Sequence, residues 1–144
     1  EFGKLISLRE WKKLDSLFFH VFYQSIIIIT AGAFIGWLCI WILQMNFQIG
    51  QRFLPAPQTA LLLATSIILI VNNGLATYLR AHKQEPLMII TIITAVLQGA
   101  TTWFLGMKYS SAGVTTGFFI ITLLFVMPAI YIIWENRRKL WHST

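Results

Sequence analysis

The segment "TYLRAHKQEP", residues 77–86, separates two long apolar runs and carries Arg80, His82, Lys83 and Glu85. This is a high local charge for a chain of 144 residues that has only 11 Lys and Arg and 5 Asp and Glu. Hydrophobic residues make up 57% of the chain and charged residues 11%, whereas soluble domains have about 25% charged residues. The composition predicts an integral membrane protein in which this segment joins two membrane helices.

Long uncharged segments separate the charged residues. They lie between residues 15 and 52, 52 and 80, 85 and 108, and 108 and 135. Each segment can hold the roughly 20 apolar residues that a membrane-crossing helix needs. We therefore predict an all-α integral membrane protein with four transmembrane helices, at about residues 17–43, 59–79, 87–105 and 114–134.

Glycine and proline residues mark the ends of these spans. Gly50 and two nearby prolines predict a loop after the first span. Pro86 suits the first turn of the third span, where its missing N–H would have no helical partner. The segment "GMKYSSAG", residues 106–113, predicts a tight turn, and Pro128 predicts a kink in the fourth span because it removes a helical hydrogen bond.

Polar segments at both ends complete the expected layout. Residues 1–16 place leucines and Trp11 at spacings of three and four between basic residues, which predicts an amphipathic helix in the headgroup region. Ser7 and Glu10 have the spacing of a capping box. Residues 135–144 read as a basic cytoplasmic tail. The chain begins without Met, and we expect it to be a piece of a longer protein.

Basic residues concentrate on one side of this layout. The side with both termini and the 77–86 segment carries nine lysines and arginines, whereas the other side carries only Arg52 and Lys108. The nine are Lys4, Arg9, Lys12, Lys13, Arg80, Lys83, Arg137, Arg138 and Lys139. Because basic loops remain cytoplasmic, both termini are expected there. The net charge of +6 therefore indicates topology and contact with membrane lipids, and we expect no binding of nucleic acid.

Arg80 and Lys83 have two readings. They are topology determinants in the simpler one. In the alternative they contact anionic lipid headgroups or the phosphates of a substrate, which Arg suits through its two-pronged hydrogen bonding.

Four amide side chains fall within the predicted spans and are the candidate substrate-binding residues: Gln24, Asn72, Asn73 and Gln98. An amide in hydrocarbon needs a hydrogen-bond partner. It either joins two helices or lines a polar cavity. The sequence leaves both alternatives open.

Small and hydroxyl-bearing residues form stripes along the same spans. The stripes are Ser25, Gly32, Gly36 and Cys39 in the first span; Thr59, Ser66, Asn73, Thr77 and Arg80 in the second; and Thr91, Thr94, Gln98 and Thr101 in the third. The pairs Gly32-xxx-Gly36 and Gly113-xxx-Gly117 favour close helix packing. We expect these faces to look toward protein or water.

Patterns for catalysis and metal binding are missing from the sequence. No Asp, Glu, Lys or Arg falls in the middle of a predicted span, so no proton relay is expected there. His20 and His82 have no second ligand at a useful spacing. No nucleophile–base pair appears. We therefore predict a protein that is not an enzyme and has no metal site and no cofactor.

Four segments carry a family likeness. They are "LREWKKLDSLF" before the first span, "YLRAHKQEP" between two spans, "YSSAGVTTGF" before the last span, and the basic end after "IYIIW". Together they resemble the C-terminal part of bacterial polysaccharide (O-antigen type) flippases, in the multidrug/oligosaccharidyl-lipid/polysaccharide exporter superfamily. The resemblance extends over nearly the whole chain.

The resemblance implies a fold of about twelve helices in two lobes, of which this chain would form the last four. It implies transport of undecaprenyl-diphosphate-linked saccharide across the bacterial inner membrane by alternating access, as in lipopolysaccharide synthesis. The implied partners are membrane lipids, the lipid-linked oligosaccharide and the N-terminal lobe of the same protein. Two other functions also fit the residues: a small oligomeric four-helix transporter or channel, and a membrane scaffold that transports nothing.

Overall fold

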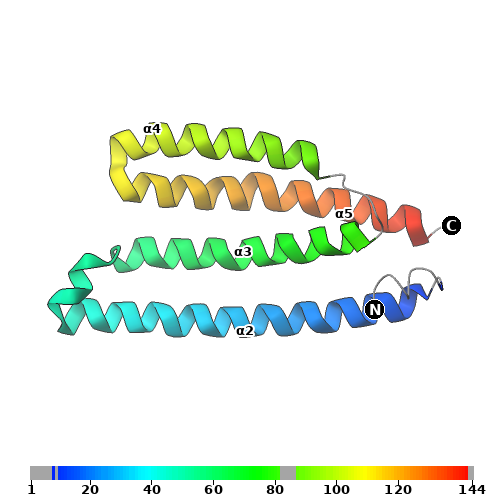
Figure 1. The fold of residues 1–144 in the computed structure, drawn as a ribbon, viewed down its shortest axis with the longest axis horizontal. Coiled ribbons are helices and arrows are strands. Elements are labelled where there is room, and N and C mark those ends of the chain that lie inside the picture. The colour runs from blue at the N-terminus through cyan, green and yellow to red at the C-terminus, as the bar shows by residue number, and fades with distance from the viewer. Residues whose placement is uncertain (1–7, 9, 82–86, 143–144) are drawn as a thin grey trace.

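The computed structural model describes residues 8, 10–81 and 87–142, and it is built of helices (Figure 1). Its elements are α2 (Trp11–Asn46), η1 (Gln48–Arg52), α3 (Ala56–Ala81), α4 (Met88–Ile121), η2 (Thr122–Val126) and α5 (Met127–His142). No strand occurs in these described ranges, so the all-α prediction is confirmed. Three helical stretches are long and apolar enough to cross a membrane, namely Trp11–Asn46, Ala56–Arg80 and Met88–Leu140.

The longest of these stretches reverses direction at Ser110. This residue has a φ of 51° and a ψ of −140°, so α4 consists of two helical segments, one on each side of it. Figure 1 shows the second segment running back alongside the first. A Cβ on Gly113 would collide with the carbonyl oxygen of Leu105, so the close approach at this turn depends on the absence of a side chain. The turn predicted over residues 106–113 is confirmed.

The helical rods lie side by side as a row, and the start of α2 and the end of α5 lie at the same end of the molecule (Figure 1). α3 contacts α2 on one side and α4, η2 and α5 on the other. α2 and the first segment of α4 form the two opposite edges of the row (Figure 1). In this arrangement much of the surface of the rods is not covered by other parts of the described chain.

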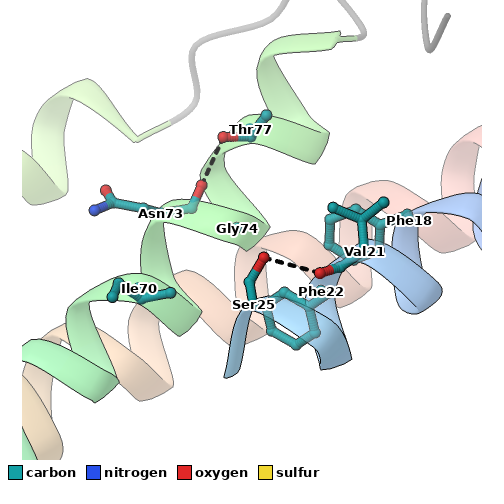
Figure 2. A pocket seen from close by; sticks show the side chains of 8 residues that line it. All are labelled: Phe18, Val21, Phe22, Ser25, Ile70, Asn73, Gly74 and Thr77. Carbon is teal, nitrogen blue, oxygen red and sulfur yellow. Dashed lines mark hydrogen bonds between the residues drawn. The ribbon is translucent and has the colours of Figure 1, made fainter. Parts of the chain in front are cut away.

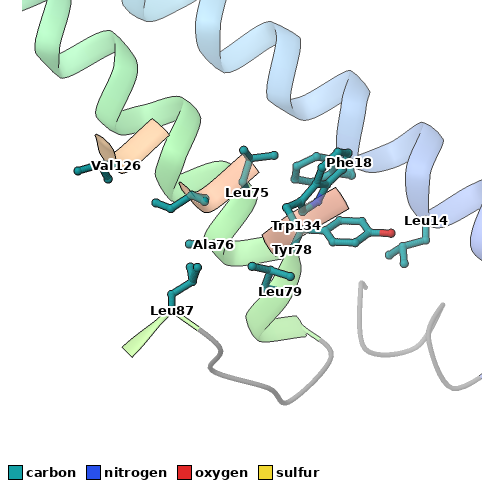
Figure 3. Packing of buried hydrophobic residues seen from close by; sticks show 10 residues of the cluster. Leu14, Phe18, Leu75, Ala76, Tyr78, Leu79, Leu87, Val126 and Trp134 are labelled. Carbon is teal, nitrogen blue, oxygen red and sulfur yellow. The ribbon is translucent and has the colours of Figure 1, made fainter. Parts of the chain in front are cut away.

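The buried core lies near the end where α2 begins and α5 ends (Figure 1 and Figure 3). Its members are Leu14, Phe18, Leu75, Ala76, Tyr78, Leu79, Leu87, Val126, Ile130 and Trp134. The Tyr78 ring stands edge-on to Phe18 at 4.9 Å and edge-on to Trp134 at 5.9 Å between ring centroids. Such pairs add about 0.5–1.5 kcal/mol to the burial of the rings. The aromatic residues therefore fasten α2, α3 and α5 together.

Hydrogen bonds close the connection between α2 and α3 at the other end of the molecule. Gln44 Nε2 donates to the carbonyl oxygen of Leu54 at 2.6 Å, and Trp37 Nε1 donates to that of Ala56 at 3.1 Å. The short helix η1 lies between these contacts. The loop predicted after the first span is confirmed, and side chains of α2 hold it in place.

The start of α2 differs from the sequence-based expectation. α2 begins at Trp11 and continues without a break past residue 17. Residues 11–16 are therefore its first turns and not a separate interfacial helix. The physical reason is that Leu14 and Asp15 contact other rods, which extends the helix beyond the apolar span. The remaining residues of the expected interfacial segment, including Ser7 of the capping box, lie outside the described residues.

The C-terminal segment also differs. α5 extends to His142, so the described part of the tail predicted over 135–144 is helical. Lys139 pairs with Glu135 one turn earlier, with an N–O distance of 2.7 Å. Such a pair supports an exposed helix by about 0.3–0.5 kcal/mol.

Pro128 changes the helix that precedes it. η2 is a π-helical turn in which the N–H of Met127 donates to the carbonyl oxygen of Thr122, five residues earlier. Proline lacks an N–H and crowds the carbonyl four residues before it. A π turn widens the helix and relieves this crowding. The irregularity predicted at Pro128 is thus present as a π turn.

Candidate functional site

One face of α3 presents polar side chains to the surroundings. Ser66, Asn73, Thr77 and Arg80 are all exposed, as the predicted stripe requires. Thr59, the fifth member, is buried and donates a hydrogen bond to the carbonyl oxygen of Leu54 at 3.1 Å. The exposed members lie on one side of α3 because residues three, four and seven apart share one side of a helix, and Ile70 lies between Ser66 and Asn73 on that side. No other described helix covers this face.

A groove between α2 and α3 runs beside the polar face (Figure 2). It has a volume of about 270 Å³ and is lined by Phe18, Val21, Phe22, Ser25, Ile70, Asn73, Gly74 and Thr77. The hydroxyl of Ser25 donates to the carbonyl oxygen of Val21 at 2.9 Å, and that of Thr77 to the carbonyl oxygen of Asn73 at 2.8 Å. Both hydroxyl protons are therefore used within their own helices, which leaves the groove largely apolar.

Gly74 determines how closely α2 and α3 approach at this groove. A Cβ at this position would lie 2.6 and 2.7 Å from two ring carbons of Phe22. The aromatic ring therefore occupies the space that a side chain on α3 would need. Sequence analysis did not identify this role, because Gly74 has no small residue four positions away, as the recognised glycine pairs have.

The neighbouring amides Asn72 and Asn73 point in different directions. Asn72 is only 3% exposed, and neither its amide nitrogen nor its oxygen has a hydrogen-bond partner within the described part of the chain. The amide of Asn73 points away from α2 on the open side of α3 (Figure 2). Asn73 is thus available to a bound molecule, whereas Asn72 faces the packed interior.

The structure does not collect the four candidate amides around one cavity. Gln24 is an exposed residue of α2, and Gln98 is a half-buried residue of the first segment of α4. These helices form opposite edges of the row (Figure 1). Among the four amides, Asn73 is the member that lines the α2–α3 groove.

The other two predicted stripes have different surroundings. Thr101, in the third-span stripe, lies against Gly117, where a Cβ would collide with its methyl group. The predicted packing role of Gly113-xxx-Gly117 is therefore confirmed. A Cβ on Gly32 or Gly36 would meet nothing within 4 Å, so this pair forms no close contact inside the described chain.

A partly buried ionic network that the sequence did not predict joins three helices. Asp15 of α2 accepts a hydrogen bond from the hydroxyl of Tyr78 of α3 at 2.9 Å. Its second carboxylate oxygen pairs with Nη2 of Arg138 in α5. The side chains of Asp15 and Arg138 are 17% and 33% exposed, so the pair is largely shielded from solvent. We refer to Asp15, Tyr78 and Arg138 as the ionic network.

Aromatic rings surround the guanidinium of this network. The Arg138 guanidinium carbon lies 5.2 Å from the centroid of the Trp134 ring and 5.6 Å from that of Phe19. Cation–π contacts of this kind are worth about 0.5–2 kcal/mol. The contact with Phe19 holds the cation of α5 against α2, whereas Trp134 belongs to α5 itself.

Basic residues gather at the same end. Lys12, Lys13, Arg80, Arg137 and Lys139 belong to the ends of α2, α3 and α5 that lie near the two termini (Figure 1). We call this the basic end. Arg80 is exposed there, and Lys83 lies outside the described residues. The described residues contain no group of three or more His, Cys, Asp and Glu side chains that could hold a metal ion.

Comparisons of the chain with protein-family models, with curated proteins and with solved structures found no match.

Proposed function

We propose that the chain is a bacterial inner-membrane protein that crosses the bilayer four times, with both termini in the cytoplasm. The reversal at Ser110 supports this number, because it divides the longest apolar stretch into two antiparallel rods. Residues 88–109 have a helical length of about 33 Å, which matches the thickness of a hydrocarbon core. The basic end supports the orientation, since lysines and arginines are retained on the cytoplasmic side.

We further propose that the chain is the C-terminal part of a polysaccharide flippase that moves undecaprenyl-diphosphate-linked saccharide. The open polar face of α3 is the observation that carries this proposal. A polar face is costly next to lipid, so it belongs against a polar cavity or another part of the protein. The missing N-terminal lobe would close that cavity. The resemblance in "YLRAHKQEP" and "YSSAGVTTGF" supports the same assignment.

The residues of the polar face have distinct roles in this proposal. The hydroxyl of Ser66 donates to the carbonyl oxygen of Leu62 at 3.0 Å, so it offers only acceptor capacity. The amide of Asn73 provides both a donor and an acceptor to saccharide hydroxyl groups. Arg80, with Lys83, provides positive charge for phosphate at the cytoplasmic end. Rocking of the two lobes would expose this face to each side of the membrane in turn.

Substitution of Asn73 by Leu in the complete exporter tests the function. One hydrogen bond of about 1 kcal/mol corresponds to roughly a fivefold effect, so surface polysaccharide of the host cell should fall about fivefold. Gln24→Leu is the matched control, because it removes an exposed amide from the outer edge of the row. Normal surface polysaccharide in the Asn73→Leu strain, at normal protein levels, would count against the assignment.

A small oligomeric transporter or channel is the second candidate. The uncovered pair Gly32 and Gly36 favours it, because such pairs let helices of neighbouring subunits approach closely. Native mass spectrometry of the purified chain separates the candidates. A defined homo-oligomer that dissociates into monomers in the Gly36→Leu variant supports the small oligomeric transporter. A monomer that binds only the N-terminal lobe supports the flippase. A monomer that binds neither a second copy nor the N-terminal lobe would support the remaining function, a membrane scaffold that transports nothing.

A further inference from the structure

The α2–α3 groove offers apolar walls and few free hydrogen-bonding groups. The hydroxyl protons of Ser25 and Thr77 are donated within their own helices. The amide of Asn73 points away from α2 (Figure 2). A saccharide or an ion would lose its hydration in such a place without gaining partners. The groove therefore suits a hydrocarbon chain.

The size and position of the groove match one lipid chain. Its volume of about 270 Å³ lies below the range of roughly 300–1,000 Å³ for drug-sized ligands. From Phe18 to Ser25 it extends about 10 Å along α2. It lies in the half of α2 next to the basic end, where one leaflet of the bilayer is about 15 Å deep. An acyl chain of that leaflet therefore fits its length.

The small-residue stripe continues the same path along α2. Gly32 and Gly36 follow Ser25 at spacings of seven and four residues, so they lie on the same face of the helix. Nothing lies within 4 Å of the position of a Cβ on either glycine. The terminal part of a chain that leaves the groove can therefore continue over this face.

The charge beyond the Thr77 end of the groove indicates which lipid headgroup binds there. Arg80 is exposed and lies three residues beyond Thr77, so the two side chains neighbour each other on α3. Arginine binds phosphate through two parallel hydrogen bonds. The other basic residues of the basic end add a field that attracts anionic lipids. A lipid with an anionic headgroup complements this surface.

We propose that the α2–α3 groove binds one acyl chain of an anionic phospholipid from the leaflet at the basic end, with the phosphate at Arg80. This goes beyond the proposed function, because it gives Arg80 a second phosphate ligand, a bilayer lipid that occupies this residue while no saccharide diphosphate is bound there. The bound chain fills the space between α2 and α3 on the open side of the row. Its phosphate neutralises Arg80 at the membrane surface.

Photo-crosslinking of the full chain tests the groove. The chain is placed in nanodiscs of phosphatidylcholine and phosphatidylglycerol that contain a phosphatidylglycerol probe with a diazirine on its acyl chain. Cross-links should concentrate on α2 and α3 residues around the groove. Val21→Trp fills the groove from a residue that is 47% exposed, and should lower this labelling at least fivefold. Ile70→Trp fills the groove from α3 and provides a second test if Val21→Trp does not fold.

A matched control separates filling of the groove from the addition of a tryptophan. Ile27 is 67% exposed and lies about 120° away from Val21 around α2. Ile27→Trp should leave the labelling of the groove unchanged. Equal labelling in the wild type and both groove variants, with the same melting temperature, would overturn the proposal.

The headgroup is tested by competition between the two phospholipids. Arg80→Gln should lower the preference for phosphatidylglycerol over phosphatidylcholine about fivefold, since one basic residue near the surface contributes about 1 kcal/mol. Lys108→Gln is the control, because it removes a basic residue from the opposite end of the molecule. Equal labelling by a phosphatidylcholine probe would overturn the assigned headgroup. Complete displacement by an equal amount of polyprenyl diphosphate would overturn the assigned lipid.

Discussion

Glycines at helical positions serve different purposes in this chain. Gly74 makes room for the Phe22 ring, and Gly117 makes room for Thr101. Gly32 has open space where a Cβ would lie. The four-residue spacing of glycines identified the close contact at Gly117 but missed that at Gly74. Which glycine packs depends on the side chain that lies opposite, and that residue comes from another helix.

Alanine substitutions of these glycines should therefore have opposite effects. Gly74→Ala forces the Phe22 ring out of its place, and such overpacking typically costs about 1–3 kcal/mol of unfolding free energy. Gly32→Ala meets nothing in the described part of the chain and should stabilise α2 by up to about 1 kcal/mol. Unfolding of the purified chain in mixed micelles measures both. Similar stability changes for the two variants would contradict the assigned contact.

The candidate amides show what a sequence can and cannot specify about single residues. The cost of an amide in hydrocarbon singles out Asn72 and Asn73 without any structure. Consecutive residues differ by about 100° around a helix, so the two amides cannot share a direction. Which of them faces the open side follows from the packing of α3 against η2 and α5. That packing is a property of the whole row of helices.

The helices themselves follow from the distribution of charge and apolar residues. Uncharged segments predicted the helical rods, and the turn over 106–113 was predicted from its small and polar residues. A helix was predicted before residue 17, but as a separate interfacial segment, and residues 135–144 were predicted only as a basic tail, because no contact between the two segments can be read from the sequence. In the structure Asp15 and Arg138 pair with each other, and this contact keeps both helix ends ordered.

Removal of the ionic network should loosen the junction of α2, α3 and α5. Arg138→Gln removes the cation that pairs with the shielded carboxylate of Asp15, and we expect the free energy of unfolding to fall by about 2 kcal/mol. This loss is smaller than that for a fully buried pair because Arg138 is one-third exposed. Asp15→Asn should cost a similar amount, and the double variant should cost less than the sum. Denaturant unfolding provides the double-mutant cycle.

The exposed pair of Lys139 and Glu135 provides the comparison for this cycle. Lys139→Gln should change stability by less than about 0.5 kcal/mol, since exposed ion pairs contribute little. Additive effects of Arg138→Gln and Asp15→Asn would show that the two residues are not coupled.

At the scale of the whole molecule, the row of rods places most of the described basic residues at one end. Lys12, Arg80 and Arg137 belong to three different helices, yet they share the basic end (Figure 1). Arg52 and Lys108 belong to the opposite end. This asymmetry is the physical basis of the orientation that we propose, because basic residues resist transfer across the membrane.

Thiol labelling checks that orientation. The single cysteine, Cys39, is first replaced by Ser, and single cysteines are then introduced as Lys108→Cys and Lys139→Cys. In intact cells a membrane-impermeant maleimide should label the protein with Lys108→Cys at once. It should label the protein with Lys139→Cys only after the membrane is permeabilised. The reverse pattern would place the basic end outside and remove the support for the flippase assignment.

The π turn of η2 sets the angular position of everything that follows it. A π turn is equivalent to one residue inserted into an α-helix, and one residue corresponds to about 100° of rotation. If the same residues formed a regular α-helix, α5 would be rotated about its own axis by that angle relative to the helix before it. Arg138 would then turn away from Asp15, so the π turn keeps the two ends of the chain in phase.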